Sequence, residues 1–248
     1  HRDLHSFPTR RSSDLKAEAW VVLAAEPGAR IQRGLKPGID RARFRQAIDE
    51  KTLMDCLHFI DAQPGMTLAQ PSGCVHAIGA GVLLAEIQQN SDVTYRVYDY
   101  DRLGLDGKPR ALHVDDALNV IGFDRLGAEF DGDMAADVVQ PTLVANSDGV
   151  QIESLLTGSK FNMSRVRIRA GATMDWTPDI LRASTVFNIW MVVKGSCRVD
   201  SLKTGNTLSV DMSATTSALI PAKAMETGLR IQAQTDIEII AAAPTEIR

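Results

Sequence analysis

Short apolar or alternating runs, bounded by Gly, Pro, Asn or Asp, recur along most of the chain. Runs of about four to eight residues with such boundaries are typical of β-strands, whose side chains alternate between two faces. The predicted strands of the first half are 21–25, 29–33, 55–60, 67–70 and 82–87. Those of the second half are 161–169, 185–193, 196–201, 218–221, 229–231 and 237–242. The chain is therefore expected to be mainly β.

Two segments follow a helical period instead. Asp40 is a typical N-cap residue, and Phe44, Ala47 and Ile48 after it fall on one face of a helix. The segment 114–121 also places its apolar residues on one side. A few short helices are therefore expected beside the strands.

The stretch 71–102 has the pattern of a hairpin with polar groups on its inner face. His76 lies on a short β-prone run, and a Gly-rich turn leads from it into the apolar run 82–87. Alternation from 93 to 100 predicts a further strand, with Arg96 on its polar face. These groups are expected to converge on a common pocket.

Glu86 is unusual because it interrupts an otherwise apolar strand. A carboxylate buried there costs several kcal/mol unless it is paired, hydrogen-bonded or bound to a metal. One interpretation is a catalytic carboxylate in the pocket. The other is a buried ion pair between Glu86 and Arg96 that holds the hairpin together, and both can apply at once.

Charged residues also begin the first predicted strand. Glu18 and Trp20 lie on the same face of it, so Glu18 can point inward beside Lys16. Charged residues at strand ends are usually solvated, and a surface pair of Lys16 and Glu18 is the alternative.

The composition is that of an ordinary globular protein. At 248 residues and 44% hydrophobic content, the chain can form one large β domain or two smaller ones. A net charge of −4 with interspersed signs gives no field that would attract nucleic acid or an anionic membrane. Cys56, Cys74 and Cys197 are odd in number and widely spaced, which favours a reducing cytosol. No apolar run approaches the roughly 20 residues of a membrane span.

The pattern divides the chain into four parts. Residues 1–15 are polar and basic, resemble the translation of a short sequencing adapter, and are expected to be an artefactual or disordered tail outside the fold. Residues 16–121 form a first β lobe, 122–145 a linker, and 146–248 a second β lobe without histidine.

Three motifs carry a resemblance to a known family. His76-Ala77-Ile78-Gly79, Leu84 to Gln89 and Thr94 to Asp99 resemble the signature of the zinc-dependent type I mannose-6-phosphate isomerases, which are cupin-fold enzymes. The similarity continues through Lys16 to Trp20, Gly34 to Gly38 and Leu112 to Ile121, and covers the first half strongly. It implies a cupin double-stranded β-helix, or jelly roll, in two lobes. The first lobe would be catalytic and incomplete at its N-terminus, and the second a degenerate cupin.

The resemblance also implies roles for particular residues. Glu18 and His76 match zinc ligands of the family, whose zinc takes a further Gln and His from an upstream Gln-Val-His-Pro element that is missing here. Glu86 is the expected proton shuttle or its orienting partner. Arg96 is the expected cation near the enediolate or the phosphate, and Lys16 a further substrate contact.

The function implied is the isomerisation of mannose 6-phosphate to fructose 6-phosphate with one zinc ion per active site, impaired in this chain. Such an enzyme would be cytoplasmic, a monomer or homodimer, and would act on a small sugar phosphate without nucleic acid or membrane. A cupin that binds or senses a sugar phosphate without turnover is the alternative. A purely structural β protein is the third possibility.

Overall fold

The computed structural model describes residues 16–91, 93–100, 103, 107–124, 138–177, 186–203 and 209–245. The chain divides into two compact units at residues 129 and 130. The predicted tail 1–15 lies outside the described residues, as does most of the predicted linker. The units are therefore described one at a time.

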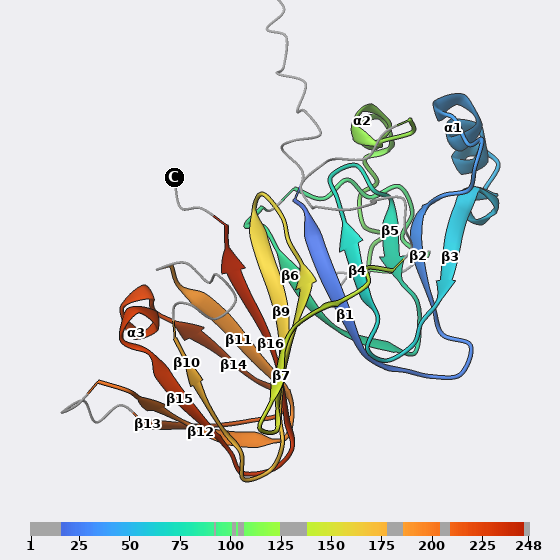
Figure 1. The fold of residues 1–248 in the computed structure, drawn as a ribbon. Coiled ribbons are helices and arrows are strands. Elements are labelled where there is room, and N and C mark those ends of the chain that lie inside the picture. The colour runs from blue at the N-terminus through green and yellow to red at the C-terminus, as the bar shows by residue number, and fades with distance from the viewer. Residues whose placement is uncertain are drawn as a thin grey trace, which may run out of the picture. The chain divides into compact units, whose positions relative to one another are not determined.

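The first unit contains two antiparallel sheets, in the strand orders β4-β1-β6 and β3-β2-β5 (Figure 1). Its elements are β1 (Glu18–Ala25), β2 (Arg30–Leu35), α1 (Arg41–Asp49), the 3-10 helix η2 (Leu53–Cys56), β3 (Leu57–Asp61), β4 (Thr67–Gln70), β5 (His76–Ile78), β6 (Val82–Gln88) and α2 (Val114–Val120). Each predicted strand of the first half up to 82–87 overlaps one of these strands.

The two sheets of this unit share an apolar core. Trp20 and Leu68 contribute from one sheet, and Ile31 and Ile60 from the other. All four side chains are buried. This packing fixes β1 against the sheet that carries β5, which brings the ends of these two strands together.

Helix α1 forms as its sequence predicts. The Asp40 side chain accepts a hydrogen bond from the backbone N–H of Arg43 at 2.7 Å, which satisfies one of the free donors at the helix start. Phe44 and Ala47 are buried, in a second core that α1 shares with η2 and α2. No helix among the described residues is long and apolar enough to cross a bilayer.

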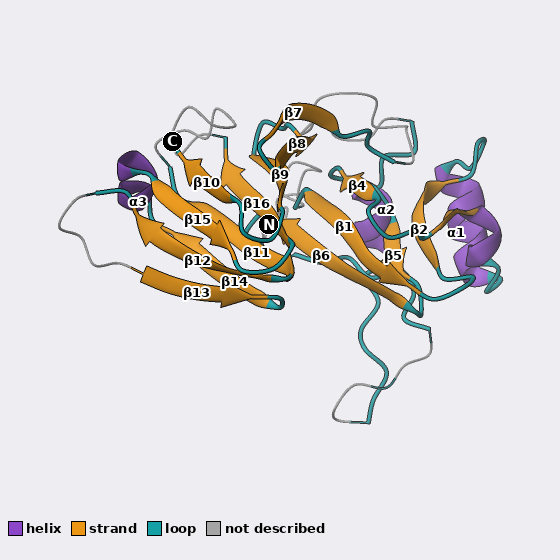
Figure 2. Ribbon diagram, turned by 60° about the horizontal axis from the view of Figure 1, so that its bottom comes forward, coloured by secondary structure: helices purple, strands orange, loops and turns teal. Residues whose placement is uncertain are grey.

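The second unit contains a six-stranded sheet, β14-β11-β16-β9-β8-β7, and a four-stranded sheet, β10-β15-β12-β13 (Figure 2). Its elements are β7 (Thr142–Ser147), β8 (Val150–Leu156), β9 (Phe161–Ile168), β10 (Thr173–Trp176), β11 (Asn188–Lys194), β12 (Ser196–Ser201), β13 (Ser209–Ser213), β14 (Thr216–Ile220), α3 (Ala222–Thr227), β15 (Leu229–Ala233) and β16 (Ile237–Pro244). Neighbouring strands are antiparallel throughout.

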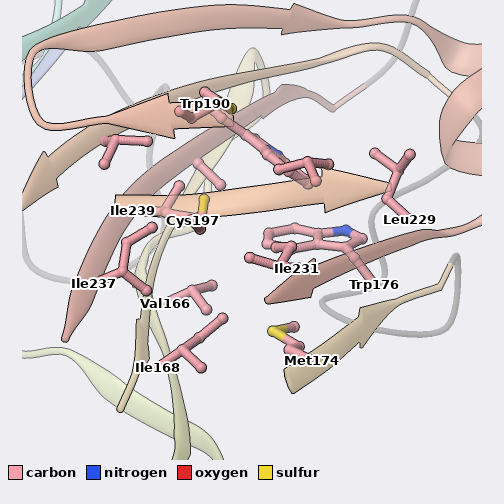
Figure 3. Close-up of a cluster of buried hydrophobic side chains, with 14 of the residues drawn as sticks. Val166, Ile168, Met174, Trp176, Trp190, Cys197, Leu229, Ile231, Ile237 and Ile239 are labelled. Atoms are coloured by element: carbon pink, nitrogen blue, oxygen red, sulfur yellow. The ribbon is translucent and has the colours of Figure 1, made fainter. Parts of the chain in front are cut away.

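These two sheets pack face to face over one core (Figure 3). Trp176 from the four-stranded sheet meets Trp190 from the six-stranded sheet, with ring centroids 4.7 Å apart and planes tilted by 40°. Both side chains are fully buried. Cys197 and Ile231 belong to the same buried cluster. The second unit therefore has a hydrophobic core of its own.

The prediction of a mainly β protein is confirmed, but two local expectations differ from the structure. The alternating segment 93–100 does not form a strand. The chain folds back beside it, and the His113 N–H donates a hydrogen bond to the Arg96 carbonyl at 2.8 Å. Strand β7 begins inside the segment predicted as a linker. Its side chains are almost all exposed, so it lacks the apolar alternation that marks a strand in sequence.

Candidate functional site

A cavity of about 320 Å³ lies within the first unit. It is bounded by the start of β1, by the turn and strand around His76, by the segment 93–100, and by α2. Lys16, Glu18, His76 and Arg96 line it, which are four of the five residues expected from the sequence. Glu86 is not among the lining residues.

Glu18 and His76 meet in this cavity from different sheets. The distance from His76 Nε2 to a Glu18 carboxylate oxygen is 3.5 Å. Glu18 is 3% exposed, so its carboxylate has lost most of its hydration and needs nearby positive charge. The interpretation of Glu18 as a solvated surface group is therefore wrong.

The orientation of the His76 ring is set on its other side. Nδ1 lies 2.9 Å from the Cys74 carbonyl oxygen, which can only accept a hydrogen bond, so Nδ1 carries the proton. The Trp20 ring packs edge-on against the imidazole with centroids 5.1 Å apart. Nε2 is therefore the ring nitrogen that faces Glu18, which is the orientation of a histidine that binds a metal through Nε2.

Lys16 provides the positive charge nearest to Glu18. Its ammonium lies 2.8 Å from one Glu18 oxygen and also donates to the side-chain amide of Gln88. Gln88 is the partner of Glu18 in the pairing of β1 with β6, so the strand register itself brings these groups together.

The donors in this cavity fit zinc in type but not in number. A catalytic zinc site takes about three protein nitrogen or oxygen ligands and keeps one position open. Glu18 and His76 supply one oxygen and one nitrogen donor. Among the residues that the structure describes, no third His, Cys, Asp or Glu joins them as a group. The described residues therefore form at most part of a zinc site.

Gly73 fixes the turn that leads into His76. Its φ of +81° is a left-handed conformation, and a β-carbon there would lie 2.8 Å from the Val120 carbonyl oxygen. Its own carbonyl accepts from the Gly122 N–H at 3.0 Å. The turn is thereby held against the end of α2, which forms another wall of the cavity.

Arg96 lines the cavity from the segment 93–100, with its side chain 25% exposed. Its guanidinium lies 3.7 Å from Asp99 and donates to the Ala111 carbonyl at 3.4 Å. No ion pair joins Arg96 to Glu86, although both are described residues. The alternative interpretation, in which an ion pair between Glu86 and Arg96 holds the hairpin, is therefore wrong.

Glu86 is exposed, contrary to the prediction that its strand is buried. Among the residues of strand β6 only Ala85 is buried, and Leu83 on it is 60% exposed. Partial loss of solvent around the carboxyl still raises the pKa of Glu86, and the negative charge of Glu18 raises it further, whereas Lys16 and His76 oppose the rise. Glu86 therefore lies near enough to interact with these three groups while remaining outside the cavity lining.

The sequence patterns missed a second charged pair at the cavity. Arg110 forms a bidentate ion pair with Asp99, which is only 7% exposed. The available signal was an acidic residue between two tyrosines, Tyr98 and Tyr100, in a segment otherwise interpreted as a strand. The pairing with Arg110 depends on the return of the chain and could not be predicted from local pattern.

Known proteins similar to this chain are mannose-6-phosphate isomerases. A probable mannose-6-phosphate isomerase of Bacillus subtilis is 40% identical over 122 residues, which are 49% of this chain and 38% of that protein. A mannose-6-phosphate isomerase of Streptococcus mutans is 40% identical over 106 residues, 43% of this chain and 33% of that protein. A putative one from B. subtilis is 30% identical over 69% of this chain and 51% of its own length. No family model matches the chain.

Solved structures agree with these relatives. The crystal structure of a B. subtilis mannose 6-phosphate isomerase superimposes with a TM-score of 0.75 at 26% identity, over 91% of this chain and 64% of that one. A putative mannosephosphate isomerase of Archaeoglobus fulgidus, at 13% identity and a TM-score of 0.64, supports the fold alone. The expected cupin fold and the resemblance to this family are thereby confirmed. The chain spans about a third to a half of the length of the curated relatives it matches.

Proposed function

We propose that this chain, a relative of the mannose-6-phosphate isomerases by sequence and by fold, carries the sugar-phosphate pocket of an aldose–ketose isomerase. The substrate would be mannose 6-phosphate and the product fructose 6-phosphate. The observation that supports this best is the pairing of the Glu18 carboxylate with the Nε2 side of His76, in one cavity with Lys16 and Arg96.

The reaction makes three physical demands. A base must move a proton between C2 and C1 of the open-chain sugar, negative charge on the enediolate must be stabilised, and the phosphate must be held by cations. Zinc bound by Glu18, His76 and further ligands would supply positive charge as a Lewis acid.

Residues of this chain would bind the phosphate and transfer the proton. Lys16 and Arg96 line the cavity from two different segments, so a sugar phosphate bound between them would meet a cation from each. Glu86, with its raised pKa, is the proposed proton shuttle or the residue that orients one, because a carboxyl that titrates closer to neutrality is a better general acid and base. The active protein is proposed to be cytoplasmic, a monomer or homodimer that acts on a small molecule.

A coupled assay for fructose 6-phosphate tests the proposal on the full chain with added zinc. Conversion of mannose 6-phosphate that depends on zinc supports isomerase activity. Calorimetric titration with mannose 6-phosphate and with mannose, under the same conditions, measures binding separately from turnover. The absence of both conversion and binding would contradict the proposal.

A protein that binds a sugar phosphate without turning it over is the second candidate. The small number of metal donors favours it: among the described residues only Glu18 and His76 come together, which is fewer than a catalytic zinc site needs. Binding needs the cations Lys16 and Arg96 but no Lewis acid. Binding of mannose 6-phosphate without conversion, at saturating zinc, would select this function.

A further inference from the structure

Asp99 holds two arginines at the wall of the cavity. Arg110 places Nε 2.6 Å from one carboxylate oxygen and Nη2 against the other, which is the fork geometry of a bidentate pair. Arg96 brings its Nε to 3.7 Å from the oxygen that Nη2 contacts. A carboxylate with 7% exposure is thus neutralised by two cations.

The two arginines differ in how they are exposed. The Arg110 side chain is 44% exposed and that of Arg96 is 25% exposed, and both border the cavity. Asp99 raises the pKa of the Arg110 guanidinium through their hydrogen bonds. Arg110 therefore remains a cation and a constant partner of this carboxylate.

The chain next to Arg110 also supports Arg96 directly. The Ala111 carbonyl accepts from Arg96 Nη1 at 3.4 Å, and the His113 N–H donates to the Arg96 carbonyl at 2.8 Å. The backbone and the guanidinium of Arg96 therefore both rest on the short segment that begins at Arg110. Anything that displaces Arg110 from Asp99 also loosens this support.

We infer that Asp99 and Arg110 are positioning residues for Arg96. Arg110 occupies both oxygens of Asp99 at hydrogen-bond distance, which keeps Arg96 at 3.7 Å from that carboxylate, at the cavity wall. Arg110 acts through Arg96 and does not itself bind the ligand. The role of Arg96 toward a sugar phosphate rests on the proposed function, whereas its orientation by this pair does not.

The first test needs no ligand. The side-chain Nε–H signal of Arg96 is observed by NMR in the full chain and assigned by its loss in Arg96→Lys. Arg110→Gln removes the two hydrogen bonds from Arg110 to Asp99, so the signal is expected to shift and its relaxation to change as Arg96 moves closer to that carboxylate. Arg110→Lys keeps the charge but cannot bridge both oxygens, and it is expected to show the same change.

A matched control is available in the same unit. Asp115 pairs with Arg45 at 2.6 Å on the surface, with its own side chain 87% exposed. Asp115→Asn removes one carboxylate charge, as Asp99→Asn does, but is expected to leave the Arg96 signal unchanged. An Arg96 signal that is the same in Arg110→Gln as in the wild type would overturn the inference.

The second test separates positioning from direct binding. Arg110→Gln is expected to weaken binding of mannose 6-phosphate roughly tenfold, the effect of losing one well-placed charged hydrogen bond. In an Arg96→Gln background the same substitution is expected to have no further effect, because its effect passes through Arg96. Additive losses would show that Arg110 contacts the ligand and would overturn the inference.

Folding and function are kept apart in this design. The Arg110 side chain is 44% exposed, but Arg110→Gln takes a partner from the buried Asp99 carboxylate, so its melting temperature is expected to fall. Arg110→Lys keeps the charge beside Asp99, is expected to melt closer to the wild type, and remains informative if Asp99→Asn does not fold. If the wild-type chain does not bind mannose 6-phosphate, the proposed function fails, while the ligand-free NMR experiment still decides the role of the pair.

Discussion

His76 Nε2 lies 3.5 Å from Glu18, and the two residues come from different sheets of the first unit. The ring is held by its Nδ1 bond to Cys74, and the carboxylate is held by Lys16. The pair exists because the core of Trp20, Ile31 and Leu68 packs one sheet on the other. Binding at this site is therefore linked to the folding of the whole unit.

Replacing either member of this pair should remove zinc binding. Loss of an outer partner costs about 10–100-fold in metal affinity, and loss of a ligand is expected to reach at least the top of that range. Competition between the full chain and a chromophoric zinc chelator measures the effect for Glu18→Gln and His76→Gln. His58→Gln on β3, away from the cavity lining, is the control and should bind zinc like the wild type.

Glu86→Gln should lower turnover much more than stability. A proton-transferring carboxyl contributes about a hundredfold or more to a rate, whereas an exposed Gln in place of Glu leaves strand packing unchanged. The kcat for mannose 6-phosphate and the melting temperature are measured on the same preparations, with Glu50→Gln at the end of α1 as control. Equal and small effects on both quantities would exclude the catalytic role.

The raised pKa of Glu86 also predicts a pH dependence of stability. Between the ordinary pKa of 4.5 and the raised value, the folded protein holds a proton that the unfolded chain has released. Stability from this group is therefore present below that window and is lost as the pH rises through it. Compared with the wild type, Glu86→Gln should therefore gain in melting temperature as the pH rises above about 4.5. A constant difference across this range would contradict the shift.

Gly73→Ala should destabilise the first unit by more than Gly38→Ala. Both glycines have φ near +80°, which costs an alanine about 1–2 kcal/mol at either position. Only at Gly73 would the new β-carbon also meet backbone, at 2.8 Å from the Val120 oxygen, whereas Gly38 has open space. Urea unfolding of both variants measures the difference, and equal losses would show that the contact with α2 relaxes freely.

Arg165→Gln should be among the most destabilising polar substitutions in the second unit. The Arg165 side chain is 4% exposed and lies between Glu153 and Glu238, at 3.3 Å from each. Removing one partner of a buried ion pair costs about 3–5 kcal/mol, because the remaining charges stay buried. Arg198→Gln, which breaks the exposed pair with Asp200, is the control and should leave the melting temperature unchanged.

Much of the local structure could be predicted from the sequence because it depends on neighbouring residues. Helix α1 begins at its predicted cap, Asp40, since the capping bond spans only three positions. The strands at 67–70 and 82–88 follow from short runs bounded by turn residues, as predicted for 67–70 and 82–87. The family resemblance also came from contiguous motifs, above all the one that begins at His76.

The burial of the site residues and the partners of their charged groups depend on contacts between segments that are distant in the sequence. The sequence left open whether Glu18 is buried or solvated. The pairing of β1 with β6 places it beside Gln88 and Lys16. Glu86 appeared buried because its neighbours along the chain are apolar, but β6 leaves it exposed.

The sequence by itself determined the β class, the local caps and turns, and the family that the first half resembles. The tertiary structure alone decided which charges are buried and which partners they have. One of the two interpretations of Glu86 paired it with Arg96 across a hairpin, whereas Arg96 lies beside Asp99, which is also paired with Arg110. Backbone preferences are set over a few residues, whereas the partner of a buried charge is set by whichever segment the fold brings within a few ångströms.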